Sequence, residues 1–575
     1  MKHCRLLELE DIFCKVYSLN VSNVGQPIRL FDVVGPNSPP LHYAPPRHKP
    51  LPTTIKRSRL EFYLDGYPPA SKRYLLDGFL RGFSLDYVGY HETSFCNNLL
   101  SAIQNPSAVN EKLSKELKLG RIAGPFSEKP LSSLRLSPLG LIPKKAPGEF
   151  RLIHRLSFPY GTSVNSHIPT EASSVRYASI DDAIRIVRRA GRGCALAKTN
   201  VKNAFRLIPV NPNDYDLLSI FWQDHFYYDK CLPMGCSSSC KIFEAFSSAI
   251  EWIARYKLST PGILHILDDF LIIERDTLTC STKLLSFLKT CDDLGVPMAP
   301  EKTVGPSTVL SFAGIELATC KLKARLPQDK IDKCTNTIQD FLKHKKVTLK
   351  DMQSLIGLLN FTCSVVVPGR TFLRRMINLT VGIRRPMHMI RLTSAVKGDL
   401  HLWLQFLTQF NGKSFFLDFV WLSSDMIHLY TDASGSLGYG AVFGRNWLYG
   451  AWPKRWSSLN IVILEMFPIV ISVEIWANRL ANKCVTFHAD NQALVEVINK
   501  KTTKDKKLLV LVRSLVLSCL KHNILFKAVH LPGLCNTSAD ALSRLQVDKF
   551  KSLDQYAAAE PTIVPPHLLP ENWPI

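Results

Sequence analysis

The sequence predicts a mixed α/β protein in which two separate regions of strands and helices flank a mainly helical one. Three observations carry this prediction. Strand and helix patterns mix from residue 55 to about residue 317, and leucines at helical spacing follow between Leu355 and Leu407. An alternating strand at residue 427 then opens a second α/β region that runs to residue 545. At roughly 150 residues per domain, a chain of this length has room for about three or four domains.

The first part of the chain begins with a lead-in and continues with helices and a hairpin. Residues 1–54 are predicted to be poorly ordered, because a proline-rich run starts at Pro36. Residues 55–119 show helical spacing of apolar side chains. Residues 137–158 predict a β-hairpin, because two apolar runs flank the turn pair Pro147-Gly148.

Changes in pattern set the remaining boundaries. We expect an α+β region at 55–325, a helical region at 326–424, an α/β region at 425–546 and a tail at 547–575. The sequence from Gln546 onward carries five prolines, so we expect the tail to be loose.

The charge of the chain favours a polyanionic partner. The sequence holds 71 Lys and Arg against 48 Asp and Glu, a net charge of +23. A strongly basic balance is typical of nucleic-acid-binding proteins. A basic protein that is merely soluble is the alternative.

Cysteine usage and apolar patterning predict an intracellular protein. The 15 cysteines include no CxxC pair. The nearest approach to a cluster, Cys231, Cys236 and Cys240, lacks a second ligand group at zinc spacing. Reduced thiols indicate the cytoplasm or nucleus. The N-terminus lacks the apolar core of a signal peptide. The sequence has no uncharged apolar stretch of about 20 residues, so we expect no membrane span.

A first candidate site lies at Asp268-Asp269, between two apolar runs that predict a hairpin over 263–273. Phosphoryl transfer by a polymerase uses two divalent cations, and Mg²⁺ needs carboxylates that converge from separate elements. The strand that would supply a further carboxylate, residues 195–200, ends instead at Asn200. Taken alone, two aspartates in a turn are more often a solvated loop.

A second candidate site consists of four acidic residues from separate predicted elements. They lie on a strand, within a helix, just after a strand and near a helix start: Asp432, Glu465, Asp490 and Asp540. A two-metal hydrolase requires such a set, because no single segment can hold both cations. For any one of these acids, a helix-terminal charge is the simpler interpretation.

The sequence segments around these sites occur in a known order. They are SPLGLIPKK (137–145), FRLIHRLS (150–157), NVKNAFRLIPV (200–210), LPMGCSSSC (232–240), ILDDFLI (266–272), PEKT (300–303), LSFAGIEL (310–317), TDASGS (431–436) and HLPGLCNTSADALSR (530–544). The first seven resemble reverse transcriptase motifs, and the last two resemble RNase H. The closest resemblance is to the reverse transcriptase–RNase H proteins of tyrosine-recombinase (DIRS-group) retrotransposons. The phrases that carry it are GRIAGPF, SPLGLIPKK, RLIHRLSFP, LPMGCS and SLIGLLNF.

The resemblance implies a fold. It implies an α+β right-hand polymerase, with fingers and palm over 55–325 and a helical thumb and connection over 326–424. An α/β RNase H-like domain would follow over 425–546.

The resemblance also implies roles in the polymerase half. Lys145 (or Lys144) and Arg151 would grip the incoming triphosphate, and Phe205 would be the gate beside the sugar. Gly235 would let the backbone approach the template–primer. The alternatives are structural: Phe205 as ordinary core, and the lysines as a solvated hairpin.

Two departures from the family pattern count against polymerase activity. Asp268 and Asp269 match metal ligands, but Asn200 stands where the motif has an aspartate. Ile266 likewise replaces a tyrosine, a change that conserves bulk. An amide is a weaker ligand for Mg²⁺ than a carboxylate. We therefore expect polymerisation to be feeble or absent, with its rate lower by several orders of magnitude.

In the nuclease half, the resemblance implies a complete catalytic set. Its members are Asp432, Glu465, Asp490 and Asp540 as metal ligands and His530 as the histidine that assists proton transfer or product release. Each active site of the family takes two Mg²⁺ (or Mn²⁺) ions. The implied partners are an RNA template, a DNA primer and the RNA–DNA hybrid, with dNTPs if the polymerase works.

Three hypotheses follow from the sequence. The chain is a working bifunctional enzyme, an RNase H attached to an impaired polymerase, or a catalytically inert retroelement relic that at most binds nucleic acid. Asn200 argues against the first and the four acids argue against the last. We therefore favour the second.

Overall fold

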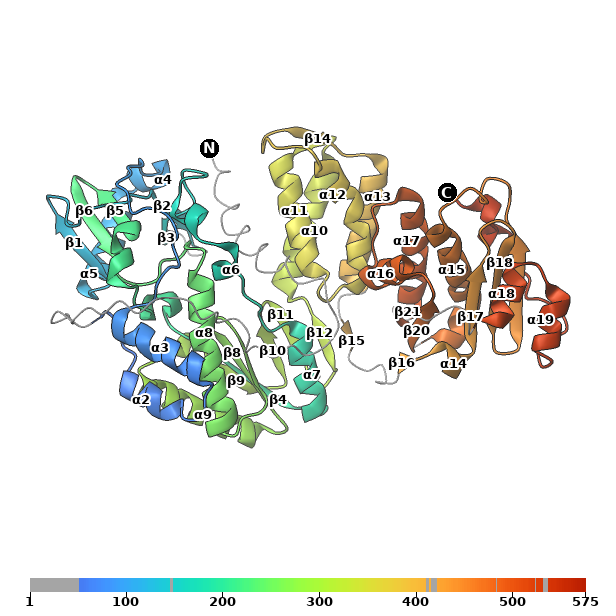
Figure 1. Cartoon of the computed structure of the whole chain (residues 1–575), viewed down its shortest axis with the longest axis horizontal. Coiled ribbons are helices and arrows are strands. Elements are labelled where there is room, and N and C mark those ends of the chain that lie inside the picture. The colour runs from blue at the N-terminus through green and yellow to red at the C-terminus, as the bar shows by residue number, and fades with distance from the viewer. Residues whose placement is uncertain are drawn as a thin grey trace. The chain divides into compact units, whose positions relative to one another are not determined.

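The computed structural model describes residues 51–144, 148–409, 413–414, 421–481, 483–522, 524–530 and 536–575 (Figure 1). The described chain forms two compact units that divide after Leu322. Residues 1–50 of the predicted lead-in lie outside the described residues. Its last residues are fixed rather than loose. The Thr53 hydroxyl donates to the Leu207 carbonyl (2.6 Å), and the Thr54 hydroxyl donates to the Gly295 carbonyl (2.7 Å).

The centre of the first unit is an antiparallel sheet in the order β7-β8-β4-β9. Its strands are β4 (Ala195–Asn200), β7 (Ile263–Ile266), β8 (Asp269–Glu274) and β9 (Val304–Ser307). Strands β7 and β8 form the predicted hairpin, with Ile266 opposite Asp269. Strand β8 also pairs with β4, so that Asn200 lies opposite Asp269.

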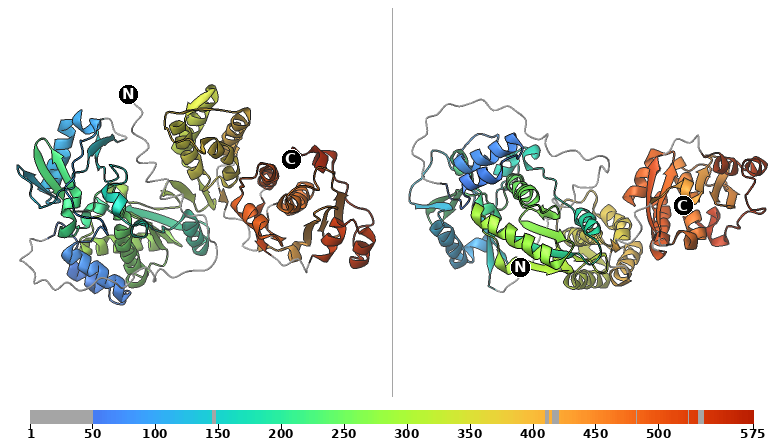
Figure 2. Two further views of the ribbon diagram at one scale, coloured as in Figure 1. Left: turned by 45° about the horizontal axis from the view of Figure 1, so that its top comes forward. Right: turned by 90° about the horizontal axis from the view of Figure 1, so that it is seen from below.

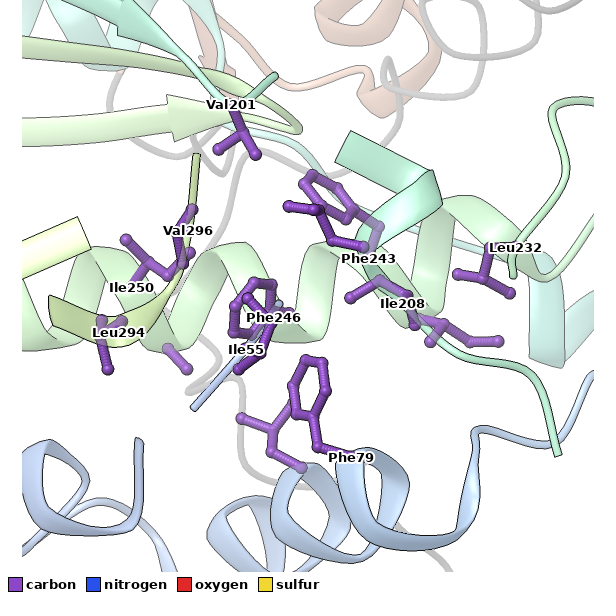
Figure 3. Close-up of a cluster of buried hydrophobic side chains, with 14 of the residues drawn as sticks. Ile55, Phe79, Val201, Ile208, Leu232, Phe243, Phe246, Ile250, Leu294 and Val296 are labelled. Atoms are coloured by element: carbon purple, nitrogen blue, oxygen red, sulfur yellow. The ribbon is translucent and has the colours of Figure 1, made fainter. Parts of the chain in front are cut away.

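Helices α8 (Ser239–Trp252) and α9 (Thr277–Leu294) pack against this sheet, and α2 (Arg57–Tyr63) and α3 (Pro69–Arg81) pack on those two helices. All four helices share one hydrophobic core with the sheet. Figure 2 shows the blue helices α2 and α3 against the green helices α8 and α9. Within the core, Phe246 of α8 packs edge-to-face on Phe79 of α3 at 5.0 Å, near Leu294 of α9 (Figure 3). Burial of such large apolar side chains is the main stabilising contribution to the unit.

The helical pattern predicted for residues 55–119 is wrong over residues 82–98, where the chain is mostly extended. Helix α3 ends at Gly82, whose φ of +86° favours glycine. A Cβ there would also lie 2.4 Å from the Val210 carbonyl oxygen. The chain therefore leaves the helix and docks beside Val210, and helices resume at α4 (Leu100–Ile103) and α5 (Pro106–Lys118).

The predicted hairpin over 137–158 is confirmed by β2 (Leu139–Pro143) and β3 (Phe150–His154), which pair antiparallel. The turn residues 145–147, and with them Lys145, lie outside the described residues. A separate three-stranded sheet, β1-β6-β5, accompanies the hairpin. Its strands are β1 (Ile122–Phe126), β6 (His225–Asp229) and β5 (Ser219–Trp222).

The second unit begins with a helical bundle. Its helices are α10 (Gln328–Lys343), α11 (Leu349–Thr362), α12 (Arg374–Thr380) and α13 (Ser394–Gln409). Asp399 of α13 is fully buried and pairs with Arg375 at 3.1 Å and with Arg513 at 2.5 Å. Because Arg513 belongs to α17 (Lys506–Lys521), this pair fastens the bundle to the α/β domain that follows.

That α/β domain combines an antiparallel sheet with a parallel one. Strands β17 (Leu429–Ala433), β18 (Gly438–Phe443) and β19 (Asn446–Ala451) are antiparallel, and β20 (Cys484–Ala489) and β21 (Leu525–His530) are parallel. Helices α15 (Ile461–Leu480), α16 (Gln492–Lys500), α17 and α18 (Thr537–Ser543) accompany them. The predicted succession of an α+β region, a helical region and an α/β region is confirmed.

Helix α15 is, among the described residues, the one helix long and apolar enough to cross a membrane. In the structure, 67% of its most apolar window is buried, and the helix contacts β17, β18 and α17. Its apolar side chains therefore belong to the core of this α/β domain.

The expectation of a loose tail is wrong for the described structure. Helix α19 (Val547–Leu553) buries Phe550 against Trp447, with ring centroids 5.0 Å apart. Farther along, the Arg455 guanidinium donates to the carbonyls of Pro570 and Trp573. Prolines prevent regular strand pairing, but side-chain packing and these carbonyl contacts hold the segment in place.

Candidate active sites

The polymerase-like site is the turn between β7 and β8. Leu267 takes a φ of +53° there, and the backbone N–H of Val201 donates to the Asp268 carbonyl at 2.9 Å. The cross-strand pairing places Asn200 directly opposite Asp269. Residues paired in this way lie close enough for their side chains to interact. The structure thus brings together Asp268, Asp269 and the amide of Asn200.

Burial and two lysines set the charge of this site. Burial raises the pKa of Asp269 to about 6, the charge of Asp268 adds to the rise, and Lys198 and Lys302 oppose it. Burial also raises the pKa of Asp268, again opposed by Lys302. Two carboxylates therefore face two ammonium groups and a neutral amide. With an aspartate at position 200, the same site would hold a third negative charge.

A buried histidine, which no sequence pattern predicted, joins the hairpin to helix α8. His265 of β7 lies between two carboxylates of α8, with Nδ1 2.5 Å from Glu251 Oε2 and Nε2 3.2 Å from Glu244 Oε1. Burial lowers the pKa of His265, but the hydrogen bonds and charges of Glu244 and Glu251 outweigh it and raise the pKa to about 9. An imidazolium therefore joins α8 to the strand that leads into Asp268.

Phe205 and Gly235 occupy separate places near this sheet. Phe205, in a short 3₁₀ helix, packs edge-to-face on Phe243 at 5.5 Å and is half-buried. Gly235 is exposed with a φ of +105°, and its carbonyl accepts a hydrogen bond from the Asn165 side-chain amide at 2.7 Å. A side chain at Gly235 would be strained by this φ.

The predicted triphosphate-binding residues lie on the β2–β3 hairpin. Arg151 is exposed on β3, opposite Ile142. Lys144 is also exposed, and its ammonium lies 3.0 Å from Glu149 Oε2. The preferred lysine, Lys145, is among the residues not described.

The nuclease-like site draws its acids from four elements of the second unit. Asp432 lies on β17, Glu465 on α15, Asp490 directly after β20 and Asp540 on α18. Contacts of α15 with β17, and of α18 with β17, bring three of these elements together. The charge of Asp490 acts on both Asp432 and Glu465, so the fourth acid lies near the same site.

Repulsion among these carboxylates shifts their protonation. Burial raises the pKa of Glu465 to about 7, and the charges of Asp490 and Asp432 raise it further. Burial likewise raises the pKa of Asp432, as do the charges of Asp540 and Asp490. Glu465 Oε2 is buried without a hydrogen-bond partner. A hard cation would satisfy this oxygen and relieve the repulsion, so the donor set fits Mg²⁺ or Mn²⁺.

Two carboxylates of this site have protein partners. The Ser543 hydroxyl donates to Asp432 Oδ2 at 2.5 Å, and Arg544 Nε donates to Asp540 Oδ1 at 2.7 Å. Within the described residues, no three His, Cys, Asp or Glu side chains are arranged so that they could hold a metal ion as they stand. The site thus has suitable ligands, two of which are engaged with Ser543 and Arg544.

His530 ends β21 beside the acids. Its Nε2 lies 3.0 Å from the Asp490 carbonyl oxygen. A carbonyl only accepts, so Nε2 carries the proton and Nδ1 can accept another. The side-chain amide of Asn536 donates to the Thr431 carbonyl at 2.8 Å, which ties the start of α18 to β17. Residues 531–535 between them lie outside the described residues.

Comparisons with known proteins place the chain beside retroviral proteins. No family model matches it. The Gag-Pro-Pol polyprotein of Mason-Pfizer monkey virus is 25% identical over 303 residues, which are 51% of this chain and 14% of the polyprotein. The match therefore spans about one seventh of that relative.

Solved structures with a similar course of the chain are foamy viral proteins. One is the protease–reverse transcriptase in complex with an RNA/DNA hybrid: 14% identity, TM-score 0.48, 83% of this chain and 63% of that one. Another is the protease–reverse transcriptase dRH with double-stranded DNA: 16% identity, TM-score 0.47, 86% of this chain and 85% of that one. The sequence match supports a relationship to retroelement polyproteins, and it does not distinguish the tyrosine-recombinase group.

Proposed function

We propose that this chain is a retroelement reverse transcriptase–RNase H whose effective chemistry is hydrolysis of the RNA strand in RNA–DNA hybrids. The observation that carries the proposal is the convergence of Asp432, Glu465, Asp490 and Asp540 from four elements. In this proposal the fingers and palm occupy 55–325, the thumb and connection 326–424 and the nuclease 425–546. The proposal includes membership of the tyrosine-recombinase group, which the resemblance of the motif phrases supports.

The nuclease mechanism follows from what each residue does. The four carboxylates would hold two Mg²⁺ or Mn²⁺ ions, which when bound supply an activated water and stabilise the leaving oxygen. Asp432 and Glu465, whose pKa values are raised without a cation, must be ionised to act as ligands. His530 would take up a proton through Nδ1 at the edge of the site or assist release of the product.

The polymerase half keeps the fold and loses a ligand in this proposal. Asn200 contributes no charge, while Lys198 and Lys302 already offset Asp269. Such a site attracts a second divalent cation less strongly than a site with three carboxylates would. It would still bind a hybrid, with a template RNA and a primer DNA as partners, but extend the primer poorly even when dNTPs are present.

Cleavage of an RNA–DNA hybrid by the purified full chain tests the nuclease. We expect cleavage with Mg²⁺ or Mn²⁺ and its loss, by at least about 100-fold, in Asp432→Asn. A matched control is Asp425→Asn, a nearby change in the same domain outside the four acids. Failure of the unaltered chain to cut any hybrid would support the inert relic instead.

Primer extension tests the polymerase in parallel. We expect little extension by the unaltered chain and a gain of about 100-fold or more in Asn200→Asp, because the reversion restores a charged ligand. A control, Asn203→Asp, adds the same charge three residues away. Robust extension that needs no reversion would contradict the proposed impairment.

A further inference from the structure

Helix α18 carries Asp540 and lies unusually close to the strand pair that carries Asp432. The register of β17 and β18 places Gly440 directly opposite Asp432. A Cβ added at Gly440 would lie 2.4 Å from Leu542 Cβ and 2.9 Å from the Ser543 backbone nitrogen. No real Cβ tolerates such distances, so only glycine lets α18 approach the sheet at this point.

The same approach brings the Ser543 hydroxyl to the catalytic aspartate. Ser543 is fully buried, and its Oγ lies 2.5 Å from Asp432 Oδ2 and 2.9 Å from the Asp540 carbonyl oxygen. A hydroxyl has one proton, and an ionised carboxylate is the stronger acceptor. The hydroxyl therefore fixes one oxygen of Asp432 and leaves the other directed elsewhere.

We infer that Ser543, seated by Gly440, is the positioning residue that sets the orientation of Asp432 relative to Asp540 and thereby the affinity of the nuclease site for divalent cations. The inference rests on the proposed nuclease function, since it concerns the same carboxylates. Groups that orient metal ligands in this way typically change metal affinity by about 10–100-fold when removed. Ser543 itself touches neither substrate nor cation in this assignment.

Mn²⁺ binding to the full chain, measured without nucleic acid by electron paramagnetic resonance, tests the inference. Asp432→Asn first identifies which bound Mn²⁺ belongs to the nuclease site and which to Asp268 and Asp269. For that site we expect Ser543→Ala to weaken the affinity by about 10-fold. Ser543→Thr keeps the hydroxyl and should retain most of the affinity.

Gly440→Ala supplies the second arm. We expect it to weaken Mn²⁺ binding at least as much as Ser543→Ala, because α18 must move away from the sheet. Gly435→Ala is its matched control, since a Cβ there meets nothing within 4 Å. Circular dichroism and thermal unfolding verify that each variant is folded. Should Ser543→Ala not fold, Ser543→Cys keeps the size and replaces the hydroxyl by a weaker donor.

The outcomes separate this inference from the proposed function. If Asp432→Asn abolishes one Mn²⁺ site while folded Ser543→Ala binds as tightly as the unaltered chain, the positioning role is wrong and the nuclease site stands. If Asp432→Asn changes no Mn²⁺ site, both fail. A loss in Ser543→Ala that Ser543→Thr largely restores would support the hydroxyl as the positioning group.

Discussion

At the scale of single residues, the candidate sites differ in how much the sequence could reveal. Asp268, Asp269, Asp432 and Asp540 stand in recognisable phrases, and Glu465 and Asp490 follow in order on predicted elements, so the types and order of these acids were visible. The contacts that orient them were not. His265 and Ser543 act on partners 14 and 111 positions away, Glu251 and Asp432. In each pair the two residues lie on different elements, so no periodic pattern within one element indicates the contact.

The His265 ion pair gives a pH prediction at this scale. Because the pKa of His265 is raised from 6.5 to about 9, the folded state binds the proton more tightly than the unfolded state. The stabilisation is therefore complete below about pH 6.5 and lost as the pH rises through about 9, by at most about 3 kcal/mol. Denaturant unfolding at pH 6.5 and 9.5 measures it. His265→Gln should show a smaller fall, and an equal fall in both proteins would contradict the assignment.

At the scale of elements, the sequence predicted the structure that local turn chemistry determines. It did not predict the structure that depends on tertiary docking. The hairpin over 137–158 follows from its own Pro-Gly turn and its flanking apolar runs. The extended path after Gly82 depends instead on contact with Val210, more than 100 residues away. The tail is the clearest case. Its prolines indicated disorder, yet Trp573 lies 5.9 Å from Phe467 in an edge-to-face contact.

The buried carboxylate of Asp399, which links two helices to α13, gives a prediction for stability. Its carboxylate pairs with Arg375 of α12 and Arg513 of α17, and its side chain is 1% exposed. Asp399→Ala would leave Arg513 as a buried charge without this partner, and such changes cost about 3–5 kcal/mol. Denaturant unfolding should show this loss. Asp340→Ala, which removes an exposed carboxylate from α10, is the control and should change the stability by less than about 0.5 kcal/mol.

At the scale of the whole chain, sequence pattern located the α/β region at 425–546, but the folded unit that contains it is larger. The unit begins at Lys323. Within it, the bundle contributes Asp399 to α17, and the Thr371 hydroxyl donates to the Lys501 carbonyl at 2.7 Å. The tail contributes Phe550 and Trp573 to the opposite elements of the domain. A boundary drawn from motifs encloses the segment that contains the candidate catalytic residues. The segment whose residues share the core is longer.

Fragments of the chain test this difference. We expect residues 323–575 to unfold cooperatively on heating, because they keep both the Asp399 contacts and the tail. Residues 425–546 lose the carboxylate that pairs with Arg513, and they also lose the rings that cover Trp447 and Phe467. Each loss exposes or unpairs a group buried in the longer fragment, so the shorter one should lack a cooperative transition at the same temperature. Circular dichroism during heating compares them. If both fragments unfolded at the same midpoint, the bundle and the tail would be accessory to a nuclease domain that folds alone.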